Sequence, residues 1–163
     1  MADADLIIEN GTINTEGGSF NAALIVADGQ IVAYAEDASG WAAPERIDAS
    51  GLLVLPGGID VHTHFEEPDP DLLEGFTSGG RAAAAGGLTS VVEMPQARPT
   101  TTTPAQFADK VQLVKDHAVV DMALWAGAIG PPLQSADDLS AMAGLGAAAF
   151  KSFMASSSPL FPA

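Results

Sequence analysis

From Gly51 onward, short apolar runs alternate with helical segments, and the runs recur roughly every 30 residues, the length of one βα unit. The predicted strands cover Leu52–Leu55 with Gly58–His62, then Leu88–Met94, Val119–Trp125 and Ala147–Phe153. The predicted helices between them cover Leu72–Ala85, Pro104–His117 and Ala136–Leu145. Strands joined through helices pair in parallel by right-handed crossovers, so this pattern predicts an α/β fold with a parallel sheet.

Four such strands do not close a sheet. An eight-stranded (β/α)8 barrel needs about 250 residues, whereas this chain has 163. We therefore expect the first half of a (β/α)8 TIM barrel, and a chain that is a fragment of a longer protein. A doubly wound open sheet is the alternative if the chain is complete, but no glycine-rich nucleotide-binding motif follows any predicted strand.

The first fifty residues instead predict short strands joined by tight turns. Asn10-Gly11 separates Leu6–Ile8 from Thr12–Ile13, and Asp28-Gly29 separates Ala23–Val26 from Gln30–Tyr34. Both dipeptides favour the type I′ turn of a β-hairpin, which needs two positive φ angles. The change of pattern at Gly51 divides the chain into a domain of residues 1–51 and a domain of residues 52–163.

Composition excludes several classes of partner. Six Lys and Arg residues against 21 Asp and Glu give a net charge of −15, which would repel a nucleic acid. Apolar stretches end well before the ~20 residues of a membrane span. The acidic N-terminus lacks the basic start of a signal peptide, and cysteine is absent. We expect a cytoplasmic protein with no nucleic-acid or membrane partner.

The most specific local motif is the histidine pair at the end of the first barrel strand. His62 and His64 are two residues apart, so strand geometry directs both imidazoles to one face with Cα atoms roughly 6.6 Å apart. The carboxyl ends of barrel strands hold active sites, which favours a metal site over a hydrogen-bonded pair. Asp60 precedes His62 by two residues and is expected on the same face, next to the metal ligands.

Lys151 is the second candidate, because it interrupts the apolar strand predicted near the end of the chain. Burial favours the neutral amine, which reacts with carbon dioxide to give a carbamate able to bridge two metal ions. The alternative is a lysine whose ammonium extends from the strand end into water.

Six segments together resemble the cyclic amidohydrolases of the amidohydrolase superfamily: allantoinases, dihydroorotases, and hydantoinases or dihydropyrimidinases. In chain order they are Gly58–Phe65, Glu67-Pro68, Glu74–Phe76, Arg81–Gly87, Leu88–Pro95 and Phe150–Phe153. The resemblance runs across essentially the whole chain and is greatest to allantoinases. It implies that residues 1–51 are the N-terminal part of a small β-sandwich, and that residues 52–163 are the first four βα units of a truncated hydrolase barrel.

The same resemblance assigns roles to individual residues. It implies that His62, His64 and Lys151 are metal ligands, with carboxylated Lys151 bridging two zinc ions or other divalent metals, and it leaves Asp60 next to them. The remaining ligands of the family, two histidines and a catalytic aspartate, lie on later strands, so no catalytic residue is expected within this chain. His117, the one other histidine, is expected to be structural, at the helix end far from the site.

The resemblance implies hydrolysis of a cyclic ureide C–N bond, with allantoin to allantoate as the leading reaction. Similar dihydroorotases carry a carboxylate-binding Arg where this chain has Glu66, which disfavours that activity. Gln96 replaces the Asn of the family, and Arg98 is either a substrate contact or an exposed loop cation. Hydantoinases usually have a tyrosine shortly after the lysine, and Ser156–Ser158 offer none.

The expected ligand is a small cyclic ureide, and the complete protein is expected to be a dimer or tetramer. Dihydroorotase and dihydropyrimidinase or hydantoinase activities remain alternatives. A further alternative is a non-catalytic, truncated homologue that acts as an assembly partner, because an open half-barrel exposes a sheet edge that needs a cover.

Overall fold

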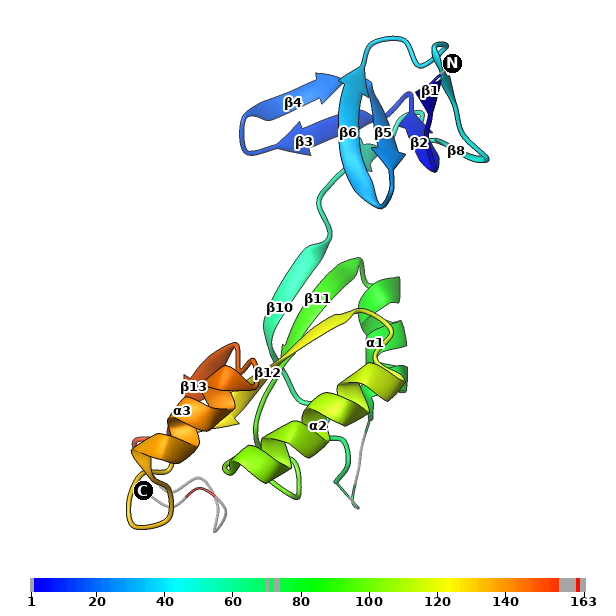
Figure 1. Ribbon diagram of the computed structural model, residues 1–163. Helices are drawn as coiled ribbons and strands as arrows, with labels where there is room; N and C mark the ends of the chain where they lie inside the picture. The colour runs from blue at the N-terminus through cyan, green and yellow to red at the C-terminus, as the bar shows by residue number, and fades with distance from the viewer. Residues whose placement is uncertain (1, 70, 72–73, 156–160, 162–163) are drawn as a thin grey trace. The chain divides into compact units, whose positions relative to one another are not determined.

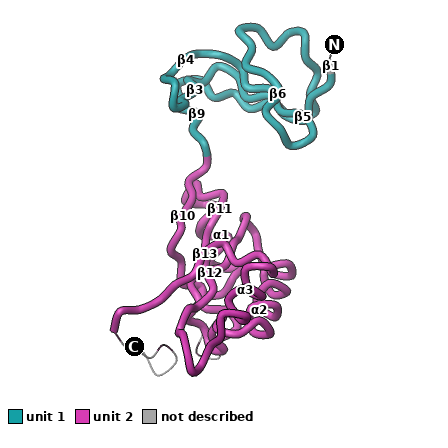
Figure 2. Tube along the Cα trace, turned by 60° about the vertical axis from the view of Figure 1, so that its left-hand side comes forward, with its two compact units in different colours: residues 1–56 teal, residues 57–163 magenta. Residues whose placement is uncertain are grey.

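A computed structural model describes residues 2–69, 71, 74–155 and 161. The chain divides into two compact units, Met1–Pro56 and Gly57–Ala163 (Figure 2). The division falls after the boundary expected at Gly51, because Leu53–Val54 pairs with a strand of the first unit and not with the parallel sheet.

The first unit consists of nine short strands among the described residues. They are β1 (Ala2–Asp3), β2 (Leu6–Glu9), β3 (Thr12–Thr15), β4 (Gly18–Asn21), β5 (Ala23–Ala27), β6 (Gln30–Ala35), β7 (Trp41–Ala42), β8 (Glu45–Asp48) and β9 (Leu53–Val54). They form a four-stranded sheet β6-β5-β2-β8, a three-stranded sheet β4-β3-β9 and the pair β1-β7. Ile7 and Ile25 are fully buried in the core of this unit. The β-rich N-terminal segment is thus confirmed.

One of the two predicted hairpins is present. Asp28 and Gly29 have φ angles of 51° and 70° and join antiparallel β5 and β6. The prediction of a hairpin at Asn10-Gly11 is wrong, since β2 and β3 lie in different sheets. A Cβ atom at Gly11 would lie 2.7 Å from the Val54 side chain, so this glycine permits a close approach of strands instead of forming a type I′ turn.

The second unit alternates strands and helices as predicted (Figure 1). The elements are β10 (Gly58–Thr63), α1 (Phe76–Ala85), β11 (Leu88–Glu93), α2 (Pro104–His117), β12 (Asp121–Gly127), α3 (Ala136–Gly144) and β13 (Ala149–Lys151). The strands pair in parallel in chain order, β10-β11-β12-β13, as in half of a (β/α)8 barrel. The helix start predicted at Leu72 lies outside the described residues.

Local sequence signals set the helix starts. Thr103 caps α2 by accepting a hydrogen bond from the Gln106 backbone N–H, and Pro104 occupies the first turn. Ser135 and Asp138 form a capping box at the start of α3. Among the described helices, none combines the length and the apolar composition of a membrane span.

Gly79 allows α1 to approach the segment that follows β10. A Cβ atom at Gly79 would lie 2.4 Å from the ring of Phe65. We expect Gly79→Ala to lower the free energy of unfolding by about 1–3 kcal/mol, because either the ring or the helix must shift. Urea denaturation measures this loss. Gly144→Ala is the matched control: its Cβ would meet nothing within 4 Å, and equal destabilisation of both variants would contradict the packing argument.

Candidate active site

The two histidines of the motif lie together at the carboxyl end of β10. The centroids of the His62 and His64 rings are 5.3 Å apart, and the ring planes are tilted by 41°. The His64 side chain is 39% exposed, so its imidazole is accessible to a ligand. The structure therefore brings these imidazoles close enough to serve one metal ion or two adjacent ions.

Strand register shows which face of the sheet the histidines occupy. Thr63 pairs with Glu93, and Glu93 pairs with Leu124, so these three side chains share one face. Leu124 packs against the helices in a core cluster with Phe107 and Met142. His62 and His64 flank Thr63 in sequence, and their ring centroids are 5.3 Å apart, so we place both imidazoles on the side of the strand end opposite Thr63, away from the helices.

Lys151 ends β13 and belongs to that same face. It pairs with Gly127, while Ala149 pairs with Trp125 two residues earlier. Trp125 precedes Gly127 by two residues, neighbours Leu124 in sequence and therefore points away from the helices. Its indole N–H donates to the carbonyl of Val61 on β10 at 2.9 Å. The Lys151 Nζ lies 5.1 Å from the centroid of the Phe153 ring.

Asp60 contacts the backbone of the motif. Its Oδ1 accepts a hydrogen bond from the His62 backbone N–H at 2.9 Å. Asp60 pairs with Val91 and Thr63 with Glu93, so β10 advances three residues while β11 advances two. This bulge interrupts the simple alternation that predicted Asp60 and His62 on one face. Asp60 acts on the conformation of the strand end.

Glu93, at the end of β11, is a fully buried carboxylate with 0% exposure. It accepts hydrogen bonds from the Thr63 hydroxyl at 3.0 Å, from the Phe65 backbone N–H at 3.0 Å and from the Glu66 backbone N–H at 2.8 Å. These donors belong to the residues on both sides of His64. A single side chain of β11 therefore holds the end of the histidine motif.

Lys110 of α2 provides the positive charge beside this carboxylate. Its Nζ lies 3.8 Å from Glu93 Oε1 and donates to the Met94 carbonyl at 3.2 Å. The side chain is 2% exposed, and burial lowers the pKa of the Lys110 ammonium, while the charges of Glu93 and Glu66 oppose that shift.

Glu66 lies beside His64. Its Oε1 is 3.3 Å from His64 Nδ1, and its backbone adopts a left-handed φ of 59°. A carboxylate at this place adds negative charge next to the motif.

Arg98 is held by two aspartates of the segment after β10. Its Nε and Nη2 donate to Asp69 at 3.0 and 2.8 Å, and its backbone N–H also donates to Asp69. Nη2 contacts Asp71 as well. The guanidinium thus connects the loop after β10 to the loop after β11, in a bidentate ion pair that the sequence did not indicate.

The Arg98 guanidinium, together with the backbone N–H groups of Asp71 and Arg98, lowers the pKa of Asp69 from 3.8 to about 2. A carboxyl group whose pKa is lower in the folded state than in the unfolded state stabilises the fold at pH values above its unfolded-state pKa. This contribution is lost as the pH falls through the folded-state pKa. We expect Asp69→Asn to destabilise the protein at pH 7, and the difference from the unmutated protein to vanish between about pH 4 and pH 2. Urea denaturation across this range tests the linkage, and a pH-independent difference would contradict it.

His117 ends α2 as predicted, where a cationic residue is favourable with the helix dipole. Its Nδ1 contacts Glu67 Oε1, and its backbone carbonyl accepts from Thr77. The other oxygen of Glu67 accepts from the Phe76 backbone N–H at the start of α1. His117 therefore contacts the segment that follows the histidine motif. This contact was not predicted, because the sequence placed His117 far from the site.

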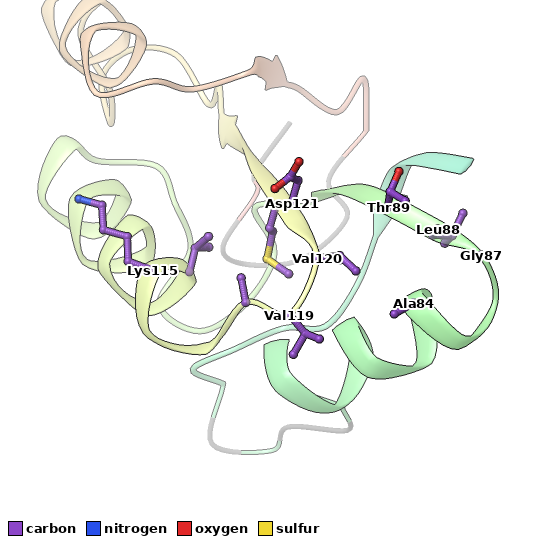
Figure 3. Close-up of a pocket in the computed structure, with 11 residues that line it drawn as sticks. Ala84, Gly87, Leu88, Thr89, Lys115, Val119, Val120 and Asp121 are labelled. Atoms are coloured by element: carbon purple, nitrogen blue, oxygen red, sulfur yellow. The ribbon is translucent and has the colours of Figure 1, made fainter. Parts of the chain in front are cut away.

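A hollow of about 690 Å³ lies at the opposite end of the parallel sheet. Its walls include Ala84 of α1, Lys115 of α2 and the first residues of β11 and β12, as Figure 3 shows. In βα barrels the amino ends of the strands serve stability, and the carboxyl ends carry the chemistry. This hollow is therefore not part of the candidate site.

Sequence reasoning did not assign roles to Glu93 and Lys110. One signal was present: Lys110 lies between Phe107 and Val111 on the apolar side of α2, and Glu93 follows the apolar pair Val91-Val92 at the end of its strand. Two opposite charges at predicted core positions favour a buried pair. Ser156–Ser158, which stand where hydantoinases usually have a tyrosine, lie outside the described residues.

Within residues 2–69, 71, 74–155 and 161, no three His, Cys, Asp or Glu side chains gather as a metal-binding cluster. The donors present, two imidazoles on one strand end and an amine on the same face, are of the types that bind divalent zinc, directly or after carboxylation. They fit part of a metal site.

This chain is similar to a known protein family and to individual proteins. The family model described as "Amidohydrolase family" matches residues 53–152. An allantoinase of Rubrobacter xylanophilus is 48% identical over all of this chain and 35% of its own length. An allantoinase of Deinococcus radiodurans is 36% identical over 91% of this chain and 33% of its own length.

Solved structures are similar as well. The L-hydantoinase (dihydropyrimidinase) of Arthrobacter aurescens matches with a TM-score of 0.89 and 35% identity, over 98% of this chain and 35% of that chain. The D-hydantoinase of Bacillus sp. AR9 matches with a TM-score of 0.82 and 29% identity, over 98% of this chain and 35% of that chain. The present chain thus spans about a third of the length of its relatives.

Proposed function

Because this chain belongs to the amidohydrolase family, we propose that the protein carrying it is a metal-dependent hydrolase of cyclic amides, with allantoin as its substrate. The observation that carries the proposal is the 48% identity to an allantoinase along the whole chain. The histidine pair at the carboxyl end of the first barrel strand supports it, because active sites of this fold lie at that end.

In this proposal His62 and His64 hold the metal, and Lys151 is a further ligand. Loss of one proton from the Lys151 ammonium gives the neutral amine. Its reaction with carbon dioxide forms a carbamate C–N bond and releases a second proton, so that a cation becomes an anionic carbamate. A bound divalent metal would polarise the ring carbonyl and lower the pKa of water. Asp60 fixes the backbone at His62, and the Glu66 carboxylate lies beside the His64 ring.

Glu66 also bears on the choice of ring. Its carboxylate lies next to His64 and would repel a substrate that carries its own carboxylate, such as dihydroorotate. Arg98, the loop cation nearest in sequence to the second strand end, is occupied by Asp69 and Asp71. A ring without a carboxylate is therefore favoured. A second candidate is hydantoin hydrolysis, supported by the likeness to the L-hydantoinase structure.

The test is a substrate comparison with the complete protein that carries this sequence. The zinc-loaded protein is assayed with allantoin, a 5-substituted hydantoin and dihydroorotate, before and after removal of metal by a chelator. We expect allantoin to be opened with the highest kcat/KM, the activity to disappear with the metal, and zinc to restore it. Failure to open any of the three rings after loading with Zn²⁺, Mn²⁺ or Co²⁺ would contradict the proposal.

A further inference from the structure

We propose that Glu93, supported by Lys110, is a positioning residue of the metal site, which acts by fixing the backbone on both sides of His64. The inference rests on the proposed function, since it takes His64 as a metal ligand. Neither residue belongs to the ligand set that the sequence suggested.

Three hydrogen bonds support the inference. The Glu93 carboxylate accepts from Thr63, which precedes His64, and from the backbone N–H groups of Phe65 and Glu66, which follow it. Glu93 is fully buried, so water does not compete for these donors. The position of the His64 backbone is thereby set by a side chain of the neighbouring strand.

The Glu66 contact has a second consequence. A non-glycine residue at φ 59° is conformationally unfavourable. The hydrogen bond from its N–H to Glu93, at 2.8 Å, holds this turn. The turn brings the Glu66 carboxylate to 3.3 Å from His64 Nδ1. A carboxylate beside Nδ1 favours the tautomer that carries its proton there, which leaves Nε2 with the lone pair that a metal requires.

A negative charge suits this position better than a neutral acceptor. The two backbone N–H groups and the Thr63 hydroxyl all donate to the two oxygens of Glu93. Lys110, 3.8 Å away and also buried, balances the charge and connects the arrangement to α2. A glutamine at residue 93 would have one oxygen and would turn an NH₂ donor toward other donors.

Glu93→Gln is therefore the test variant, made in the complete protein that carries this sequence, with Co²⁺ as the probe. We expect its Co²⁺ affinity to fall roughly 10–100-fold, the loss typical of partners that orient a metal ligand. The visible absorption bands of bound Co²⁺ should change, and backbone amide exchange at Phe65 and Glu66 should accelerate. Exchange is measured by NMR or mass spectrometry without metal.

Met142→Ala is the matched control for general destabilisation. Met142 is fully buried in α3 and packs with Phe107, Leu124 and Ala126 on the helix side of the sheet. We expect this variant to lose stability yet to keep the Co²⁺ affinity and spectrum of the unmutated protein. Equal loss of affinity in both variants would overturn the inference, because general destabilisation would explain it.

Thr63→Val serves where Glu93→Gln does not fold. It removes one donor to Glu93 and keeps the carboxylate, so a smaller loss of Co²⁺ affinity is expected, with faster exchange at Phe65 and Glu66. If the folded variant kept its Co²⁺ affinity, its spectrum and its amide exchange, the inference about Glu93 would be wrong, while the proposed function would stand. An unmutated protein that binds no Co²⁺ would instead overturn the proposed function.

Discussion

Replacing both His62 and His64 with alanine should remove the divalent metal from the protein. These imidazoles lie with centroids 5.3 Å apart at the carboxyl end of β10 and are the proposed ligands from this strand. We expect metal affinity to fall more than about 100-fold, beyond the roughly 10–100-fold loss that follows changes around the ligands. Elemental analysis of the complete protein after equilibration with limiting Zn²⁺ measures the effect.

His117→Ala is the matched control, since it removes the same side chain from the end of α2, where the ring contacts Glu67. This variant should bind as much zinc as the unmutated protein and should keep the proposed cyclic amidase activity. If the double variant at His62 and His64 bound as much zinc as the control, the proposed metal site would be wrong.

Replacing Lys110 with methionine should cause a large loss of stability. Methionine preserves much of the volume but removes the ammonium that lies 3.8 Å from the buried Glu93 carboxylate. Removing one partner of a buried ion pair typically costs about 3–5 kcal/mol, so we expect the free energy of unfolding to fall by this amount. Urea denaturation of the complete protein measures the change.

Two comparisons identify the cause. Lys115→Met, an exposed position on the same helix, should change the free energy of unfolding by no more than about 0.5 kcal/mol. The double variant Glu93→Gln with Lys110→Met should lose less than the sum of the single losses, because the two residues are coupled. Full additivity would show that the two side chains act independently.

Much of the fold follows from local sequence. Helix α2 has the predicted bounds because Thr103 and Pro104 provide a start signal that needs no distant partner. The Asp28-Gly29 hairpin also follows from two adjacent residues with positive φ. Asn10-Gly11 is the same kind of turn dipeptide, but the hairpin predicted there is wrong, because β2 pairs with β5 and β8.

The candidate site likewise combines features that local sequence predicts with contacts between distant residues. The spacing of His62 and His64 is local, and the strand alternation that pairs them is a property of the backbone. Arg98 was open to a substrate role in the sequence, but in the structure Asp69 and Asp71 hold its guanidinium. That ion pair joins two loops 29 residues apart in the chain, a distance over which sequence patterns carry no pairing signal.

The sequence alone determined the parallel strand and helix alternation and the paired imidazoles, because both depend on residues only a few positions apart. Tertiary contacts determine that Leu53–Val54 joins the first unit and that Glu93 holds the backbone around His64. Those contacts arise when separate elements pack together. Folding brings Glu93 to Phe65 across 28 positions, and hydrogen bonding of a buried charge then selects its partners.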